Sequence, residues 1–490
     1  MQEKKRNPLK SWLLSGGSLD SHHEAHKPHP WYLVLWLTGV DYFSTLGYQP
    51  GIALLAAGAI SPLATILLVL VTLFCALPVY SQVASRSYAG QGSIAMLENL
   101  LGGWSSKIFV LVLIGFAATD FVITITLSAA DAAQHAVENP ILEPYLHGHQ
   151  ILLTLVLLFC LAVVFIKGFA EAIGFAAAIA VPYLLLNAIV LIRAMYEVFS
   201  HPELIANWKL GIWTHPRVMD SLPALLALTA ITFPKLALGL SGFETGVSVM
   251  PLVKGDNSDG IPPEGRIRNT RKLLTSAALI MSVFLIASSF ATSILIRKSD
   301  YDGGKASGRA IAFLAHEYLG TGFGTLYDFV TILILWFAGA SAMAGLLSLI
   351  PRYLPRFGMA PRWTAYRRPL VLVLFFISVI VTIVFKANVE AQGGAYATGV
   401  LALMLSAATA VAISLHKKDA SLKEQALRFY FWLVAAVFAF TFIDNVIERH
   451  DGIIISGVFI LAVIIFSAIS RYLRATELRI APFDFADEDS

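Results

Sequence analysis

Twelve apolar runs, each long enough to cross a lipid bilayer, dominate this sequence of 490 residues. The hydrocarbon core of a bilayer is about 30 Å thick, so a helix needs about 20 apolar residues to cross it. Charged residues make up 14% of the chain, whereas soluble domains carry about 25%. The sequence therefore predicts an all-α membrane protein with about twelve transmembrane helices.

The predicted spans, in chain order, are 31–58, 61–86, 107–136, 149–166, 170–196, 222–252, 273–297, 323–349, 368–386, 393–415, 428–447 and 453–473. The glycine-rich stretch 88–103 is too polar to cross the bilayer, and we expect a cytoplasmic re-entrant or interfacial segment there. We expect a long outer loop over 198–221 and an amphipathic outer helix over 307–320.

Lysine and arginine are distributed unevenly between alternate loops. If the N-terminus is placed inside, the inner segments hold 25 of these residues and the outer segments hold 9, while Lys235 lies within a span. Cytoplasmic loops are enriched in Lys and Arg. We therefore expect a multi-pass protein of the cell membrane with both termini in the cytoplasm. The polar N-terminus lacks the pattern of a cleaved signal peptide.

The first and sixth spans are each interrupted by glycine, proline and polar residues. Paired broken helices in corresponding positions indicate a transporter built from inverted repeats, with its site at the bilayer midplane. We expect a 5+5 inverted repeat followed by two spans that form a packing or dimer surface, so a homodimer is a candidate assembly. The predicted division is a cytoplasmic tail 1–30, repeats 31–196 and 222–415, spans 11 and 12 in 428–473, and a cytoplasmic tail 474–490.

The first span carries an acid near its middle. Asp41 lies deep in the span, and Tyr48 follows seven residues later. Gly47, Pro50 and Gly51 weaken the helix around them. An ionised acid at the membrane centre costs about 2.5–3.5 kcal/mol on insertion scales. Asp41 therefore needs a cation, a proton or a basic partner, or else it is a protonated, hydrogen-bonded structural residue.

The third span carries a polar stripe. Asp120, Thr124 and Ser128 follow one another at intervals of four residues, so they share one helical face. Their oxygen atoms suit hard cations and hydrogen-bonded substrates. Thr126 points elsewhere, and we interpret it as bonded to its own backbone.

The sixth span carries the third deep acid, Glu244, together with Ser241. Glycines surround both residues, and unwound backbone at this point would expose carbonyl groups to a cation and amide groups to an anion. Because an acid inside a membrane must be neutralised, Glu244 is a candidate proton carrier. Lys235 lies nine residues earlier, and we expect its side chain to snorkel towards the interface rather than to pair with an acid.

Several other polar residues have simpler interpretations. We expect the acids near span ends to be solvated caps; they are Asp131, Asp328, Asp444 and Glu448. Asn187 and Tyr396 either line the path or pack, and the small residues of 339–345 indicate close helix packing. The chain has no Walker A loop, no HExxH and no paired CxxC. We therefore expect a transporter, not an enzyme, with no cofactor and no nucleic-acid partner.

The ten-span core resembles the amino acid–polyamine–organocation (APC) superfamily, with its LeuT/APC-type fold. The Ser-Gly-Phe-Glu of 241–244 resembles the Gly-Phe-Glu of many amino acid permeases. The chain is most similar to the KimA-type potassium importers of the KUP group, in which span 1 carries an Asp and a Tyr seven residues apart, as Asp41 and Tyr48 are here. The segments 98–100 (Glu-Asn-Leu) and 396–400 (Tyr-Ala-x-Gly-Val) are also similar.

Span 3 supports this resemblance with one departure. The family carries Asp-Tyr with a Thr and a Ser on one face, and here Asp120 is followed by Phe121, so one hydroxyl is missing. The resemblance implies cation uptake coupled to protons, with Glu244 as the coupling residue. The implied potassium ligands are Asp41, Tyr48, Asp120, Thr124, Ser128 and Ser241.

Three functions remain open on these observations. The first is a proton-coupled potassium importer, and the second is a proton-coupled amino acid permease of the same fold. Permeases usually carry a small glycine-rich motif in span 1, whereas this chain has Asp41-Tyr42-Phe43-Ser44, and Asp41 would repel a substrate carboxylate. The third is a membrane receptor that has lost transport, against which the intact broken helices and deep acids argue.

Overall fold

The described residues of the computed structural model are 12–13, 28–88, 90, 92–100, 103–167, 173–218, 220–256, 259–353, 361–416 and 421–474. Within these residues the chain is helical, with a single isolated bridge between His29 and Val253 in place of any β-sheet. The all-α prediction is confirmed. The predicted tails 1–30 and 474–490 lie almost entirely outside the described residues.

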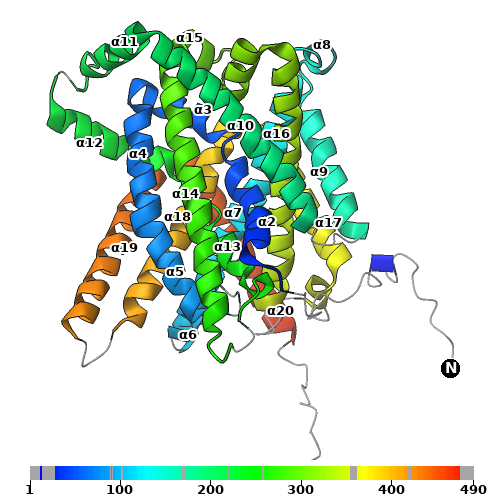
Figure 1. Cartoon of the computed structure of the whole chain (residues 1–490). Coiled ribbons are helices and arrows are strands. Elements are labelled where there is room, and N and C mark those ends of the chain that lie inside the picture. Colours follow the sequence, from blue (N-terminus) through cyan, green and yellow to red (C-terminus); the bar gives the residue numbers. More distant parts are fainter. Residues whose placement is uncertain are drawn as a thin grey trace, which may run out of the picture.

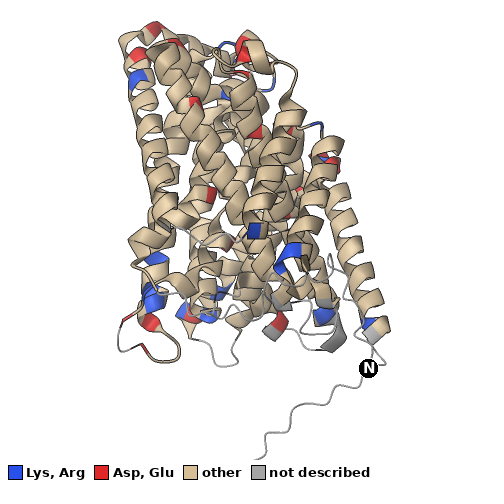
Figure 2. Ribbon diagram, turned by 90° about the vertical axis from the view of Figure 1, so that its right-hand side faces the viewer, with Lys and Arg blue, Asp and Glu red and all other residues tan. Residues whose placement is uncertain are grey.

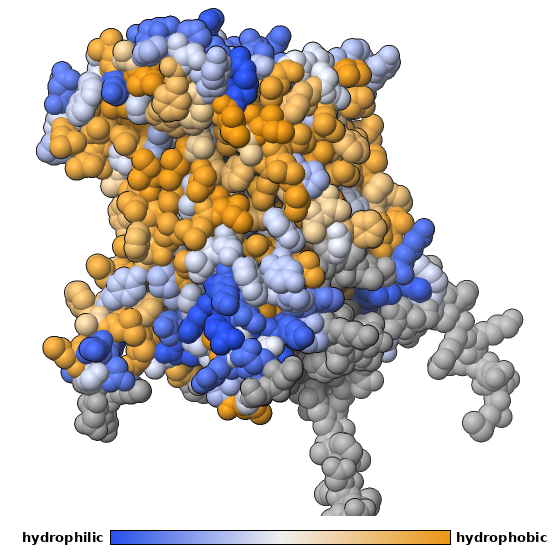
Figure 3. Space-filling view, viewed as in Figure 1, coloured by the Kyte–Doolittle hydropathy of each residue, from blue (hydrophilic) through white to orange (hydrophobic). Residues whose placement is uncertain are grey.

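Eleven helical segments of the described chain are long and apolar enough to cross a membrane. The first of them, Trp31–Arg86, is 56 residues long and contains the first two predicted spans, so each of the twelve predicted spans corresponds to helix. Apolar side chains form a band around the middle of the molecule, with polar surface at both ends (Figure 3). This band has the form expected of a surface that faces lipid.

The helices form one bundle of long, roughly parallel elements (Figure 1). Their bounds are α2 (Trp31–Ser44), α3 (Gln49–Ala57), η2 (Gly58–Ile60), α4 (Ser61–Val71), η3 (Thr72–Ala76), α5 (Leu77–Arg86), α6 (Gly92–Leu100), α7 (Gly103–Val137), α8 (Glu143–Leu146), α9 (Gln150–Lys167), α10 (Ile173–Ser200), α11 (Pro202–Trp213), α12 (Leu222–Thr232), η4 (Phe233–Leu240), α13 (Phe243–Ser248), η5 (Met250–Leu252), α14 (Glu264–Leu295), α15 (Lys298–Tyr301), α16 (Ala310–Tyr353), η7 (Arg362–Ala365), α17 (Arg367–Val384), α18 (Val389–Ser414), α19 (Leu422–Glu448) and α20 (His450–Arg474). In Figure 1, α8, α11 and α15 lie at the top and α6 at the bottom; we call these the α8 end and the α6 end.

The first predicted span is broken where the sequence indicated. Helix α2 ends at Ser44 and α3 begins at Gln49, and turns connect them. Pro50 has no N–H, so the carbonyl of Leu46 has no helical donor four residues on. This break exposes backbone oxygen in the interior of the bundle.

The sixth predicted span is broken as well. Helix α12 passes into the 3₁₀ segment η4, and α13 starts only after Gly242. Gly242 has φ +88°, and a Cβ there would lie 2.9 Å from the ring of Tyr42 on α2. A left-handed glycine is thus required at the point where the two broken helices meet.

One prediction about the segments at the α8 end needs correction, because the expected loop 198–221 contains the helix α11. The expected outer helix 307–320 corresponds to the first part of α16, which begins at Ala310. A kink at the non-helical residue Gly320 (φ 82°, ψ 167°) separates this part from the rest of α16, which continues to Tyr353.

Helix α7 is central, because α9, α16, α18 and α20 all pack against it. Helix α19 packs against α18, and α20 packs against α7 and α18. Lys and Arg gather at the α6 end of the molecule, whereas acids are more frequent at the α8 end (Figure 2).

Candidate functional site

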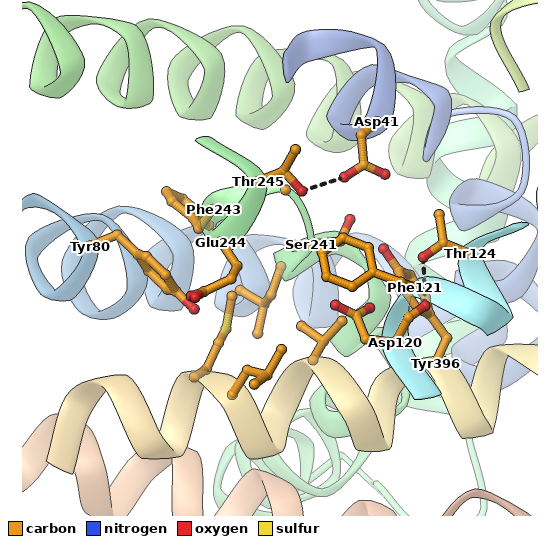
Figure 4. Close-up of a pocket in the computed structure, with 15 residues that line it drawn as sticks. Asp41, Tyr80, Asp120, Phe121, Thr124, Ser241, Phe243, Glu244, Thr245 and Tyr396 are labelled. Carbon is orange, nitrogen blue, oxygen red and sulfur yellow. Dashed lines mark hydrogen bonds between the residues drawn. The ribbon is translucent and has the colours of Figure 1, made fainter. Parts of the chain in front are cut away.

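A small cavity lies where the breaks of the two interrupted helices face α7 and α18 (Figure 4). Its space admits about one water-sized particle. The polar residues that line it are Asp41, Tyr80, Asp120, Thr124, Ser241, Glu244, Thr245 and Tyr396. Three carboxyl groups therefore face one small space, and no Lys, Arg or His is among the lining residues.

Asp41 joins the two broken helices. It lies in the last turn of α2 and is buried. The hydroxyl group of Thr245, in α13, donates a hydrogen bond of 2.9 Å to Oδ2 of Asp41 (Figure 4). The other carboxylate oxygen remains free to face the cavity, so Asp41 is placed to bind a positively charged group.

Asp120 and Thr124 face the cavity from α7. The Thr124 hydroxyl donates to the carbonyl of Asp120 at 2.8 Å, so its oxygen can still accept a bond or coordinate a cation. Helix α18 passes close by at Gly399, where a Cβ would lie 3.0 Å from Cβ of Asp120. Thr126 donates to the carbonyls of Val122 and Ile123, which confirms its interpretation as a backbone-bonded threonine.

A chain of hydroxyl groups connects Tyr48 with the cavity. Tyr48 donates to the hydroxyl of Thr45 at 3.4 Å, and Thr45 lies 3.4 Å from the hydroxyl of Ser241. Ser241 in turn interacts with the phenol of Tyr396. Neutral oxygens from α18 and from the breaks of both interrupted helices are thus connected in series.

Glu244 lies at the other end of the cavity from Asp41 and Asp120 (Figure 4). Its Oε1 accepts hydrogen bonds from the backbone N–H and the hydroxyl of Ser93, at 3.0 and 3.2 Å. The phenol of Tyr80 lies beside the same carboxyl group. The first turn of α6 therefore holds this acid, and it approaches closely because Gly92 has no side chain: a Cβ there would lie 2.2 Å from Oε1 of Glu244.

The structure brings together five of the seven predicted site residues, namely Asp41, Asp120, Thr124, Ser241 and Glu244. Tyr48 and Ser128 are buried outside the lining, Tyr48 being linked to it through Thr45. Of the two residues left undecided, Tyr396 lines the cavity, whereas Asn187 bonds to Tyr183 and Tyr327 elsewhere in the bundle.

Sequence reasoning did not identify three contacts of the site, which are made by Tyr80, Ser93 and Thr245. Thr245 is next to Glu244 in the sequence, and its position in an interrupted helix was a usable signal. Tyr80 and Ser93 reach Glu244 over a long separation in sequence, so only the folded chain places them there.

The interpretation of the end-of-span acids as solvated caps is wrong for Asp131 and Asp328, which are buried at 0% and 1% exposure. Asp444 is half-buried, and Glu448 is exposed. Glu448 pairs with Lys235 at 2.9 Å, so the expectation that Lys235 snorkels without an acidic partner is wrong too. Each error arose because the position of a residue along one span does not show which side chains the neighbouring helices place beside it.

Comparison with known proteins supports the fold. No family model matches the chain, and no curated protein sequence is significantly similar to it. The structure is similar to a crystal structure of the manganese transporter of Eremococcus coleocola in complex with an aromatic bis-isothiourea substituted compound. The match covers 92% of this chain and 98% of the other, with a TM-score of 0.54 and 12% sequence identity. At this identity the likeness shows the fold alone: the chain shares the all-helical, multi-pass fold of that structure, which agrees with the predicted fold class.

Proposed function

We propose that this chain is a secondary active transporter that takes up a monovalent cation, potassium, together with protons. The observation that carries the proposal is the excess of negative groups in the cavity. Asp41, Asp120 and Glu244 face it, and none of its lining residues is basic. Buried carboxylates without basic partners require a cation or a proton.

The size of the cavity favours an ion over an amino acid. Its space admits about one water-sized particle, and a dehydrated potassium ion is close to that size. An amino acid would need several times this room, and its carboxylate would be repelled by Asp41 and Asp120. The structure thus supports the first of the three functions considered above.

The choice of donors favours a monovalent ion over a divalent metal such as manganese. Among the described residues, no group of three or more His, Cys, Asp or Glu side chains is placed to hold a metal ion. The neutral oxygens of Thr124, Ser241 and Tyr396 are instead interleaved with the acids. We propose Asp41, Asp120, Thr124 and Ser241 as the ligands, with Tyr48 acting through Thr45.

The resemblance to the KimA-type importers supports the same proposal. Three residue sets carry it, in spans 1, 3 and 6, and five of those residues line one cavity. We propose that 31–196 and 222–415 are the two inverted repeats and that both termini are cytoplasmic, because Lys and Arg gather at the α6 end (Figure 2).

The proposed mechanism is alternating access around the cavity. Between the two helix breaks, a cation exchanges its water ligands for carboxylate and hydroxyl oxygens of the protein, while Glu244 binds a proton. Because Ser93 and Gly92 connect Glu244 to the first turn of α6, neutralisation of this acid would loosen the α6 end. The cation and proton then leave together towards the cytoplasm.

Uptake of a rubidium tracer into proteoliposomes tests the proposal. We expect uptake that depends on an inward proton gradient and is inhibited by potassium but not by amino acids. Asp41→Asn and Asp120→Asn should each abolish it, whereas Glu143→Gln, at an exposed site on α8, should not. Uptake of an amino acid without any rubidium uptake would refute the potassium assignment.

A further inference from the structure

Asp131 is a buried acid without a hydrogen bond among the described residues. It lies in α7, it is fully buried, and no described residue donates a hydrogen bond to either of its carboxylate oxygens. The carboxyl group points at the break of the first span, since a Cβ on Gly47 would lie 3.1 Å from Oδ2. Such a group costs several kcal/mol unless it binds a proton or a cation.

Asp131 belongs to a larger set of charged groups between the cavity and the α8 end. We call this set the outer acid–histidine cluster; its members are Asp131, His135, Glu138, Arg309, His316 and Asp328. Tyr48 from the helix break and Tyr183 from α10 are the phenols that face Asp131. Ser128, the predicted site residue outside the cavity, lies three residues before Asp131 on α7.

Asp328 connects the two histidines of the cluster. Its Oδ1 lies 2.8 Å from Nδ1 of His135, and its Oδ2 lies 2.8 Å from Nε2 of His316. The second ring nitrogens, Nε2 of His135 and Nδ1 of His316, are buried and have no hydrogen-bond partner within the described part of the chain. Each imidazole can therefore hold a proton on one side and pass one on the other.

The charges of the cluster do not balance without protons. Three carboxyl groups face a single permanent cation, Arg309, which pairs with Glu138 at 2.7 Å and reaches Asp328 at 3.6 Å. Two further positive charges are needed for neutrality. The groups that can supply them by protonation are His135, His316 and Asp131.

The members of the outer acid–histidine cluster follow one another from the surface into the interior. His316 retains 12% side-chain exposure, Asp328 and His135 are almost completely buried, and Asp131 lies one helical turn before His135 on α7. The series thus runs from the surface of the α8 end to the break of the first span.

We propose that the outer acid–histidine cluster is a proton path that loads Asp131 from the outer face, separately from Glu244. His316 takes up a proton on Nδ1 and gives one from Nε2 to Oδ2 of Asp328. The Asp328 carboxyl group gives one from Oδ1 to Nδ1 of His135, and His135 gives one from Nε2 to Asp131. This inference rests on the proposed function for proton coupling and for its direction, since the α8 end is outer if the termini are cytoplasmic.

Two measurements on Asp131→Asn test the path. In proteoliposomes that contain a pH-sensitive dye, proton influx driven by potassium should fall about a hundredfold, the range for loss of a positioned proton-transfer group. Exchange of rubidium for potassium across the same membranes, without any gradient, should continue near the wild-type rate. Asp444→Asn, a half-buried acid outside the cluster, should leave both rates unchanged.

A second readout does not depend on transport. In the infrared difference spectrum between acidic and basic pH, the wild type should show the C=O band of a protonated carboxyl group that Asp131→Asn lacks. An unchanged spectrum overturns the path, even if the wild type proves to carry no potassium. Loss of rubidium exchange in a folded Asp131→Asn protein also overturns it, because Asp131 would then bind the cation itself.

His316→Gln covers the case in which Asp131→Asn does not fold, because His316 lies at the exposed start of the series. This variant should slow proton influx and spare exchange. Unaltered proton influx would refute the path.

Discussion

Gly92 is the residue whose replacement tests how Glu244 is held. It has φ +69°, and a Cβ would lie 2.2 Å from Oε1 of Glu244. Any side chain at this position must displace the carboxyl group that Ser93 binds. The position of Glu244, the proposed coupling acid, therefore depends on the lack of a side chain at Gly92.

We predict that Gly92→Ala strongly reduces the rate of proton-coupled uptake, whereas it lowers the free energy of unfolding only by the cost of backbone strain. The left-handed backbone alone should cost about 1–2 kcal/mol on thermal unfolding. Gly148 is the matched control, because it has φ +77° and a Cβ there would have nothing within 4 Å. Gly148→Ala should show a similar strain with normal uptake, measured as tracer flux and melting temperature; equal flux in the two variants would contradict the prediction.

Phe121 is the residue at which the chain departs from the importers it resembles, and it lines the cavity. We predict that Phe121→Tyr lowers the potassium concentration at half-maximal uptake about fivefold, since one added hydrogen-bonding oxygen contributes about 1 kcal/mol. Phe116→Tyr is the control, because Phe116 stacks edge-on against Phe442 outside the cavity. A higher half-saturation concentration in Phe121→Tyr would show that Phe121 is required for its size.

At the scale of elements, the small residues of α16 set how closely this helix packs on α7. A Cβ on Gly345 would lie 2.7 Å from the Phe121 ring, whereas a Cβ on Gly339 would only touch Ile125 at 3.7 Å. Neither glycine lines the cavity. The sequence favoured close helix packing for these small residues. At Gly345 this packing also fixes the position of Phe121, which lines the cavity.

We predict that Gly345→Ala reduces potassium uptake and Gly339→Ala does not. The added methyl group at 345 must move the Phe121 ring, and overpacking of this kind typically costs about 1–3 kcal/mol. Uptake rate and thermal stability measured side by side check the prediction. Identical effects of the two alanines would exclude a special role for this contact.

At the scale of the whole molecule, the distribution of charge predicts orientation. Glu143 and Lys423 are exposed residues at opposite ends of the bundle, on α8 and α19. In a background without Cys75 and Cys160, an impermeant maleimide applied to intact cells should label Glu143→Cys and leave Lys423→Cys unlabelled. Permeabilised cells should label both, and the reverse pattern in intact cells would place the termini outside.

Much of the architecture could be predicted from the sequence because it depends on local properties. Apolar length identified the spans, and Gly47, Pro50 and Gly242 marked the breaks. Helical spacing placed Asp120 and Thr124 on one face, and both line the cavity. A membrane solvent makes these patterns informative, since it allows few ways to satisfy the backbone.

The tertiary structure alone decided which partner contacts each buried charged group. Asp41 and Asp131 both lie in apolar spans, yet Thr245 bonds to Asp41, whereas no side chain that the structure describes bonds to Asp131. Lys235 pairs with Glu448, and Asp328 pairs with His135, although the partners are far apart in sequence. Sequence by itself determined where each acid lies along its predicted span. The packing of distant helices determined which partners neutralise it, because electrostatic energy depends on distances that no single span contains.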